Sequence, residues 1–280
     1  EAFIATGTCI FDTNAIMSRL RVLEGKSPWK EGSFSYEAER ISFDAIRLKG
    51  RTFREEKNGE IRIYKEVEAG KPYVLGGDTA GEGSDYFTAQ VVDNVTGEVV
   101  AVLKRQYDED EYAKQIYCLG MYYNTALVSL EVNFSSHPIK VLELLGYPNL
   151  YVREVYDNYT GQLKKAFGWH TNSTTRPVLV ATVQEYVRDN LYQIHDPDTL
   201  RECLTFIRNE KGRAEAEAGE HDDLIMALGI ALCSRGQQRM QVEAEKTEKK
   251  TIWTADMWED YRHASAQEKA YLVEKYGSPK

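Results

Sequence analysis

The sequence lacks any apolar run close to the ~20 residues of a membrane-spanning helix, and its N-terminus has no basic segment followed by an apolar stretch. We therefore expect neither a membrane anchor nor a signal peptide, and a cytosolic site of action. Only four of the 280 residues are cysteines, and they are scattered without the paired spacing of a metal site. They are expected to be buried free thiols.

Basic residues are also in the minority, because 35 Lys and Arg stand against 44 Asp and Glu, for a net charge of −9. This balance excludes a protein coated in positive charge for nucleic acid, but not a local basic groove beside an acidic site. The phosphate-cradling motif Gly-x-x-x-x-Gly-Lys-[Ser/Thr] is absent too. The chain therefore has no predicted ATP site and no predicted organic cofactor.

One stretch organises the chain, Lys71-Pro-Tyr-Val-Leu-Gly-Gly-Asp-Thr-Ala80. Its apolar run is too short for a helix and is followed by two glycines, which favours a buried strand that ends on Asp78. The glycines leave room for a close approach by backbone or ligand, and residues 81–84 predict a loop that borders a substrate. Alone, Asp78 is equally well explained as a turn residue.

The segments that follow predict an α/β fold. In order they are strands over 87–93 and 98–104, a helix over 108–124, a strand over 126–132 that ends on Glu131, a helix from Pro138 to Leu145 and a short strand over 150–153. This order is typical of a mixed sheet covered by helices on both faces. A right-handed connection lays the Glu131 strand beside the Asp78 strand, so the two carboxylates meet at one sheet edge.

The remaining segments add a hairpin, helices and a tail. Residues 156–176 predict a protruding hairpin, and helices are expected from Pro177 to Asp189 and over 197–205, before a short strand pair around residues 209–212. Residues 219–233 predict a buried helix with an acidic first turn that contains Asp222 and Asp223. Residues 34–46 fit a helix or an extended wrap. Residues 237–280 are polar, with tryptophans and tyrosines spaced among balanced charges, and predict a helical tail.

The predicted topology brings Asp78, Glu131, Asp222 and Asp223 together. Carboxylates in one place repel each other unless cations lie between them, and all-oxygen ligation suits Mg²⁺ or Mn²⁺. Two such ions about 4 Å apart activate a water and stabilise the leaving oxygen of a phosphodiester. Structural explanations compete with this one: simple helix capping is the alternative for Asp222 and Asp223, and pairing with a surface lysine is the alternative for Glu131. His221 and Asp85 are better explained as a capping or supporting histidine and a loop turn residue.

Four blocks in this order resemble the nuclease domain of the large terminase subunit of tailed bacteriophages. They are Gly76-Gly-Asp-Thr-Ala-Gly-Glu-Gly-Ser-Asp-Tyr86, Ser129-Leu-Glu-Val-Asn133, Gly168-Trp-His-Thr-Asn-Ser-Thr-Thr-Arg-Pro177 and Gly219-Glu-His-Asp-Asp-Leu-Ile-Met-Ala-Leu228. The opening residues Glu1–Asp12 resemble the linker between the packaging ATPase and that nuclease. The resemblance covers roughly residues 1–235.

The resemblance implies an RNase H-like fold with a five-stranded mixed sheet and a metal-dependent endonuclease that cuts concatemeric double-stranded DNA during genome packaging. By this analogy Asp78 bridges two metals, Glu131 holds one, and the Asp222-Asp223 pair supplies the remaining ligand, with Asp223 favoured. Candidate phosphate contacts are Lys164, Lys165, Arg176 and Arg188, and ordinary solvated loop charges explain these residues equally well.

The resemblance also implies a domain organisation and partners. Residues 1–70 become a linker or arm from an absent ATPase domain, residues 71–236 the nuclease, and residues 237–280 a tail that docks on a portal. The chain begins at Glu1 rather than Met, which fits the C-terminal part of a larger terminase. Double-stranded DNA, a portal protein, a small terminase subunit and the ATPase domain of the same polypeptide are the expected partners, in the cytoplasm of the host.

Three other functions compete with this one. A different RNase H-like enzyme, such as a resolvase or transposase, shares an acidic triad, so fold alone does not separate them. A non-catalytic packaging adaptor with a degenerate nuclease fold is a second alternative. An unrelated acidic binding domain is the third, and it requires the spacing of the four blocks to be accidental.

Overall fold

The computed structural model describes residues 8–79, 86–106, 108–157, 161–238, 258, 261–264 and 269. Contacts divide the chain into two units, residues 1–240 and residues 241–280. In the second unit the rings of Trp258 and Tyr261 meet nearly at right angles, with centroids 6.4 Å apart. Most of the predicted tail, the substrate-bordering loop over 81–84 and Asp85 lie outside the described residues.

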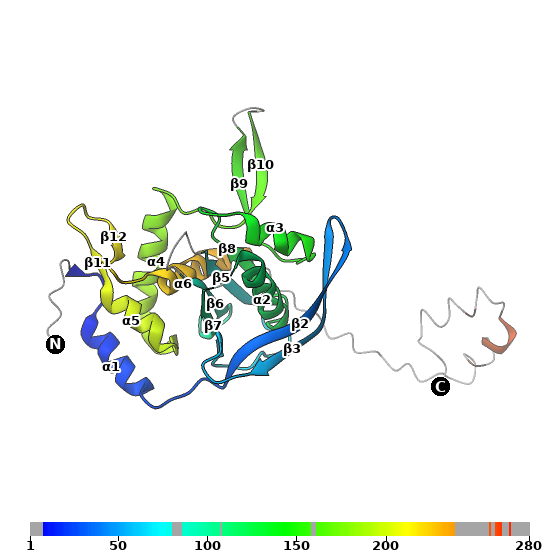
Figure 1. Ribbon diagram of the computed structural model, residues 1–280, viewed down its shortest axis with the longest axis horizontal. Coiled ribbons are helices and arrows are strands. Elements are labelled where there is room, and N and C mark those ends of the chain that lie inside the picture. Colours follow the sequence, from blue (N-terminus) through cyan, green and yellow to red (C-terminus); the bar gives the residue numbers. More distant parts are fainter. Residues whose placement is uncertain are drawn as a thin grey trace. The chain divides into compact units, whose positions relative to one another are not determined.

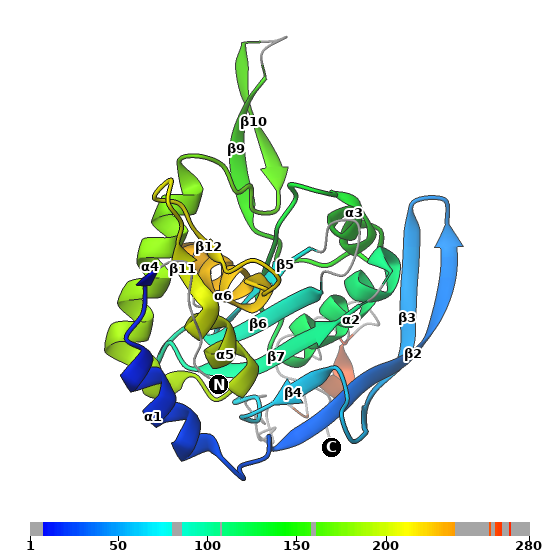
Figure 2. The same cartoon turned by 60° about the vertical axis from the view of Figure 1, so that its left-hand side comes forward.

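The first unit is built on a mixed sheet of seven strands in the order β3-β2-β4-β7-β6-β5-β8 (Figures 1 and 2). Its strands are β2 (Lys30–Ser42), β3 (Ala45–Glu55), β4 (Ile61–Ile63), β5 (Tyr73–Asp78), β6 (Phe87–Asp93), β7 (Val99–Arg105) and β8 (Leu127–Leu130). Strands β5 and β8 pair in parallel, and the other neighbours are antiparallel. The predicted α/β class with a mixed sheet is confirmed.

The expected number of five strands was wrong. Residues 30–63 add three strands, of which β2 and β3 form a long hairpin at one edge of the sheet. The first half of β2 packs on the core but its second half is exposed, so the strand shows little of the alternation that identifies strands in a sequence. Residues 34–46 cover most of β2, the turn over 43–44 and the start of β3, so the helix alternative was wrong. In the predicted strand over 150–153, Leu150 makes a parallel bridge to Val128, and β9 begins at Val152. Whether residues 1–70 also serve as an arm from an ATPase domain stays a prediction.

Helices cover both faces of the sheet. They are α1 (Thr13–Leu23), α2 (Glu109–Tyr122), α3 (His137–Leu144), α4 (Thr175–Asn190), α5 (Pro197–Thr205) and α6 (Asp223–Ser234). Helices α2 and α3 share one apolar cluster with Leu75, whereas α1, α4, α5 and α6 share another with Val74. Successive strand residues point to opposite faces, so the two clusters lie on the two sides of the sheet. Helix α1 was not predicted, and α2 to α6 lie where the sequence placed helices.

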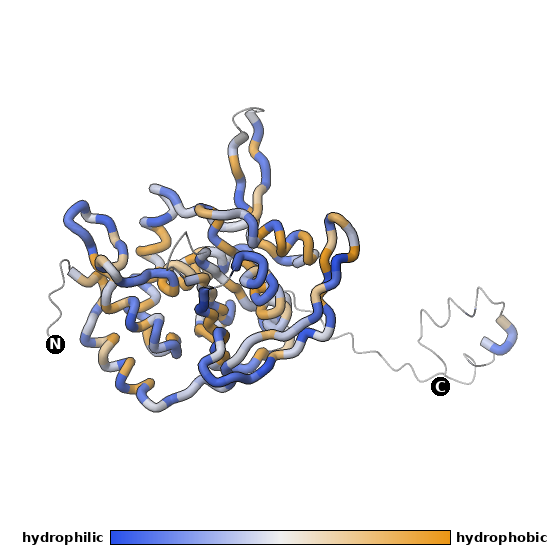
Figure 3. The backbone as a smooth tube through the Cα atoms, in the orientation of Figure 1, coloured by the Kyte–Doolittle hydropathy of each residue, from blue (hydrophilic) through white to orange (hydrophobic). Residues whose placement is uncertain are grey.

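Two small hairpins border the sheet. Strands β9 (Val152–Asp157) and β10 (Gln162–Phe167) pair antiparallel and project from the body of the unit (Figures 1 and 2), and both carry hydrophobic as well as hydrophilic residues (Figure 3). The predicted protruding hairpin is therefore present, starting slightly earlier than expected. Strands β11 (Phe206–Arg208) and β12 (Ala214–Ala216) form the other hairpin and, with β1 (Thr8–Cys9), a three-stranded sheet.

The Gly76-Gly77 pair lets two elements approach the end of β5. A Cβ on Gly76 would lie 2.2 Å from the backbone nitrogen of Ala231 in α6, and one on Gly77 would lie 2.3 Å from the Tyr112 hydroxyl in α2. Both distances are much shorter than a van der Waals contact, so a larger residue at either position would clash. Ten of the twelve residues of α6 are buried, and the helix packs on β5 and β6. Its N-terminus lies near the end of β5, because Asp223 bonds Thr88, the β6 residue that pairs with Asp78.

Helices long and apolar enough to cross a membrane are not found among the residues that the structure describes.

Candidate metal-dependent active site

Asp78 and Glu131 lie side by side at one edge of the sheet. The backbone N–H of Glu131 donates to the carbonyl of Gly77 at 2.9 Å, which continues the parallel pairing of β5 and β8 by one residue. The two carboxyl groups are close enough to interact, because the charge of Glu131 raises the pKa of Asp78. Both are buried, with 9% of Asp78 and 5% of Glu131 exposed, so the predicted meeting of two carboxylates at a sheet edge is present.

Asp222 and Asp223 reach the same place from the start of α6. The hydroxyl of Thr88 on β6 donates to the backbone carbonyl of Asp223 at 2.8 Å, and the backbone N–H of Tyr86 approaches its Oδ2 at 3.4 Å. Nδ1 of His221 lies 3.5 Å from the same oxygen, which is the supporting position expected for this histidine. Strand β6 therefore holds Asp223 next to the ends of β5 and β8.

Asp222 is the N-cap residue of α6, yet its side chain caps no N–H group of the helix. Its Oδ2 instead accepts a hydrogen bond from Nη2 of Arg176 at 3.1 Å, and Arg176 also donates to the carbonyl of Ala214. Simple capping, the structural alternative weighed for the aspartate pair, thus does not describe this side chain. Asp222 and Asp223 differ in environment, since Asp222 forms a salt bridge with Arg176 and Asp223 lies next to His221.

All four carboxylates line one pocket of about 1060 Å³. Burial raises the pKa of Asp78 well above its usual value, and the neighbouring charges of Glu131, Asp223 and Asp222 raise it further. Burying like charges together is unfavourable unless protons or cations are shared between them. The arrangement therefore favours binding of positive charge at Asp78.

The donors match a hard divalent cation, because they are all carboxylate oxygens. Over the residues described, however, no group of three or more His, Cys, Asp or Glu side chains is already arranged around an ion position. The salt bridge between Arg176 and Asp222 explains part of this, since it turns one carboxylate toward a protein cation. The chemistry of the donor set therefore fits a metal, although the four carboxylates are not gathered around one ion position.

The predicted phosphate contacts fall in three different places. Arg176 lines the pocket. Lys164 and Lys165 lie on the exposed strand β10 of the projecting hairpin (Figure 2). Arg188 lies in the last turn of α4, pairs with Asp189 at 2.7 Å and is not among the residues that line the pocket. The structure thus brings one of the four to the carboxylates.

Several pocket residues were missed by sequence reasoning. The β11–β12 hairpin brings Arg208, Lys211 and Arg213 to the pocket, and the segment after Glu131 brings Asn133 and Phe134. The hairpin itself was predicted, but nothing in its spacing related it to Asp78. The side-chain amide of Asn133 donates to the backbone carbonyl of Thr171 at 2.5 Å and accepts from its backbone N–H at 2.8 Å. These two bonds connect the second and third sequence blocks.

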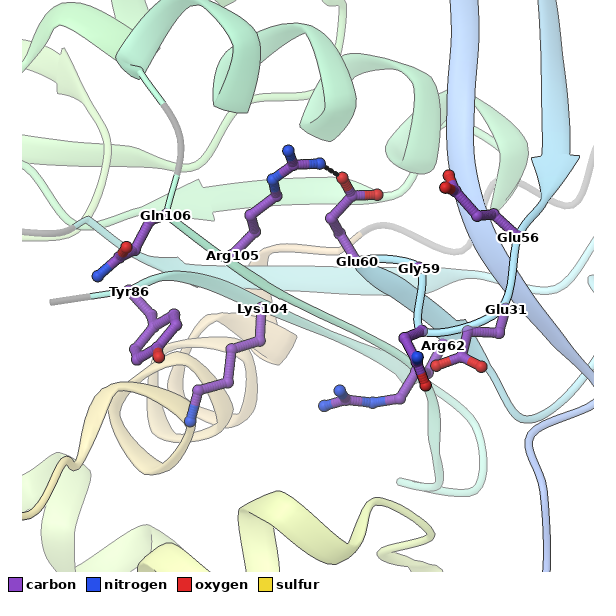
Figure 4. A pocket seen from close by; sticks show the side chains of 10 residues that line it. Glu31, Glu56, Gly59, Glu60, Arg62, Tyr86, Lys104, Arg105 and Gln106 are labelled. Carbon is purple, nitrogen blue, oxygen red and sulfur yellow. Dashed lines mark ion pairs between the residues drawn. The ribbon is translucent and has the colours of Figure 1, made fainter. Parts of the chain in front are cut away.

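A second pocket, of about 750 Å³, lies among β4, β7 and the turn before β4 (Figure 4). It carries both signs of charge: Arg105 is paired with Glu60, and Lys104 extends beside the ring of Tyr86. Arg62 is held by Asp196 and Asp198 of the α5 region at 2.8 and 3.3 Å. It is lined by three acids, Glu31, Glu56 and Glu60, and three bases, Arg62, Lys104 and Arg105, so it does not resemble the carboxylate pocket.

Comparison with solved structures relates the fold to phage proteins. The large terminase nuclease of the thermophilic phage G20c, with bound magnesium, matches 78% of this chain and 96% of its own, at a TM-score of 0.51 and 16% identity. A further structure of that nuclease matches the same shares at a TM-score of 0.47 and 17% identity. The large terminase nuclease domain of Thermus phage P74-26 matches 63% of this chain and 86% of its own, at 0.46 and 17%.

No protein-family model and no curated protein sequence matches the chain. The structural likeness nonetheless defines the class of fold, because the magnesium-bound nuclease is matched over nearly its whole length. This chain shares the fold of a phage large terminase nuclease, and the resemblance read from its four sequence blocks is confirmed at that level.

Proposed function

We propose that the protein is a metal-dependent endonuclease with an RNase H-like fold that cuts concatemeric double-stranded viral DNA during genome packaging. The observation that carries the proposal is the meeting of the buried carboxyl groups of Asp78 and Glu131 with Asp223 at one pocket. The likeness in fold to a nuclease with bound magnesium supports it. We propose Mg²⁺ or Mn²⁺ as the cofactor, with two ions in the working site.

In this proposal Asp78, Glu131 and Asp223 would hold the metal ions. When bound, the metals lower the pKa of a water and neutralise charge that develops on the scissile phosphate. The pairing of β5 with β8 holds the backbones of Asp78 and Glu131 side by side. Asp222 keeps Arg176 at the pocket, where its guanidinium is available to a phosphate oxygen beside Asp223.

DNA in this proposal contacts basic residues on both hairpins. The predicted Lys164 and Lys165 lie on β10, and Lys211 and Arg213 follow β11 at the pocket. Such contacts to phosphates give affinity without reading sequence. We further propose that the protein works with an ATPase domain, a small terminase subunit and a portal in the cytoplasm of the host, with residues 237–280 as the portal-docking segment.

The direct test is cleavage of supercoiled plasmid in Mn²⁺, Mg²⁺ or EDTA, with the Asp78→Asn variant alongside. The proposal expects nicked and linear DNA with either metal, none in EDTA, and a loss of at least about 100-fold in the variant. Asn keeps the size of the side chain and removes its charge. Metal-dependent cleavage that survives Asp78→Asn would locate the chemistry elsewhere.

A non-catalytic packaging adaptor is the second candidate. It is favoured by the finding that, among the described residues, no three or more His, Cys, Asp or Glu side chains are gathered around one ion position. The same plasmid experiment separates the two functions: an adaptor binds DNA and cuts it under no metal condition, although it remains folded.

A further inference from the structure

A carboxylate from another helix holds the first turn of α6. Glu202 lies on α5 and is 6% exposed. Its Oε2 accepts hydrogen bonds from the backbone N–H groups of Leu224 at 2.8 Å and Ile225 at 3.3 Å. The first N–H groups of a helix have no partner within the helix, and Asp222, the N-cap residue, does not bond them. Glu202 therefore supplies the cap that the local sequence does not.

Two side chains of β6 hold the same turn by its carbonyl groups. The hydroxyl of Thr88 donates to the carbonyl of Asp223, and Nε2 of Gln90 donates to the carbonyl of Leu224, both at 2.8 Å. Gln90 also bonds the hydroxyl of Thr199 on α5, at 3.1 Å. The backbone of Asp223 is thus fixed between α5 and the sheet, and the direction of its carboxylate follows from that placement.

Lys104 connects this cap with the other neighbours of Asp223. Its ammonium lies 2.9 Å from Oε1 of Glu202 and 4.8 Å from the centroid of the Tyr86 ring. Figure 4 shows the Lys104 side chain extending from β7 alongside that ring. The backbone N–H of Tyr86 in turn approaches Oδ2 of Asp223. Glu202 and Lys104 are both largely buried, with side-chain exposures of 7% and 18%, so water competes little for their contacts.

We propose that Glu202, held by Lys104, is a positioning residue that sets where the Asp223 carboxylate meets the metal. Neither residue lines the pocket of the four carboxylates. The proposal rests on the nuclease function proposed above. Groups that orient a metal ligand from behind commonly change metal affinity by about 10- to 100-fold when they are removed.

The test compares three variants. Glu202→Leu removes the hydrogen-bond acceptor at similar side-chain volume, and Glu202→Gln keeps an acceptor oxygen without the charge. Leu23→Ala removes a buried side chain of α1 and is the control for general destabilisation. Amide exchange at Leu224 reports the cap in the metal-free protein. Calorimetry with Mn²⁺ alone reports metal affinity, and cleavage kinetics separate kcat from KM.

In Glu202→Leu we expect faster exchange at Leu224, Mn²⁺ affinity reduced by about 10-fold or more, and a matching loss in kcat with KM for DNA little changed. Glu202→Gln should restore most of both, and Leu23→Ala should leave Mn²⁺ affinity unchanged. Glu202→Leu with the Mn²⁺ affinity and kcat of Leu23→Ala would overturn the proposal.

Should Glu202→Leu fail to fold, Lys104→Met takes its place, because it leaves the cap and removes the charge that holds Glu202. A smaller loss in the same direction is expected, and unchanged Mn²⁺ affinity would overturn the proposal. If the folded wild type neither binds Mn²⁺ nor cuts DNA, the nuclease function fails and the positioning role falls with it. Exchange at Leu224 then still shows whether Glu202 caps α6, so the two failures are distinguishable.

Discussion

The backbone N–H of Glu131 donates to the carbonyl of Gly77, which places the carboxyl groups of Asp78 and Glu131 at the same end of two parallel strands. Burial is the larger cause of the raised pKa of Asp78, and the charge of Glu131 raises it further. A folded protein bears such a pair at a cost. A bound cation between the two carboxylates would offset the unfavourable free energy of burying them together.

Asp222 and Asp223 are expected to differ when each is changed to Asn. Asp223→Asn should weaken Mn²⁺ binding and cleavage by about 100-fold, because it removes a proposed ligand. Asp222→Asn should cost far less metal affinity, because its carboxylate is paired with Arg176. Calorimetry with Mn²⁺ and plasmid cleavage measure both. Equal losses in the two variants would mean that both carboxylates bind metal and that the Arg176 salt bridge opens.

Gly76→Ala should destabilise the fold by about 3 kcal/mol or more, because the added methyl meets backbone atoms of α6 that have nowhere to move. The free energy of unfolding in urea measures the effect. Gly236→Ala is the matched control, since a Cβ there meets nothing within 4 Å. A stable Gly76→Ala protein would show that α6 lies farther from β5 than described.

Asp93 should contribute to stability above about pH 4 and lose that contribution in acid. Burial raises the pKa of its carboxyl, but hydrogen bonds from the N–H of Val95 at 2.8 Å and from Lys71 at 3.0 Å outweigh burial and hold the pKa below its usual value. A lowered folded pKa means that the stabilisation disappears as pH falls through it. Asp93→Asn should therefore narrow the difference in unfolding free energy between pH 7 and pH 3.

Urea titrations at the two pH values measure that difference. The control is Glu143→Gln, a charge removal at an exposed position of α3. A wild type and an Asp93→Asn variant that lose equal stability between pH 7 and pH 3 would contradict the assignment.

The double variant Lys164→Ala/Lys165→Ala should weaken binding of a DNA duplex several-fold in Ca²⁺, and should reduce the slope of log affinity against log salt by up to about 2. These lysines lie on the projecting β10 strand. The matched control is Arg47→Ala/Lys49→Ala on β3, which also removes two exposed cations from a hairpin. An unchanged salt slope in the β10 variant, or an equal loss in both, would remove the β9–β10 hairpin from the DNA path.

The parts of the fold that the sequence predicted are those with strong local signals. The strand that ends in Gly76-Gly77-Asp78 and the apolar helix α6 are identifiable because nearly every residue is buried, and the expected meeting of Asp78 and Glu131 follows from one parallel connection. Strand β2 and the first half of β3 were not recognised as part of the sheet, because many of their residues are exposed and the apolar alternation is weak.

The contacts of the site that were not predicted join residues far apart in the sequence. The salt bridge of Asp222 with Arg176 and the capping of α6 by Glu202 join residues 46 and 22 positions apart. Only packing of α4, α5 and α6 brings them together, and no spacing in the sequence records it. The basic residues of the β11–β12 hairpin were missed for the same reason.

The most direct test is a crystal structure of the protein soaked in Mn²⁺, with anomalous scattering used to locate the metal. The account predicts two peaks about 4 Å apart, with Asp78 between them and Glu131 and Asp223 on either side. The same soak of Asp78→Asn should show neither peak at comparable occupancy. Peaks elsewhere, or none at this sheet edge in protein that still cuts DNA, would contradict the central claim that these carboxylates form the catalytic metal site.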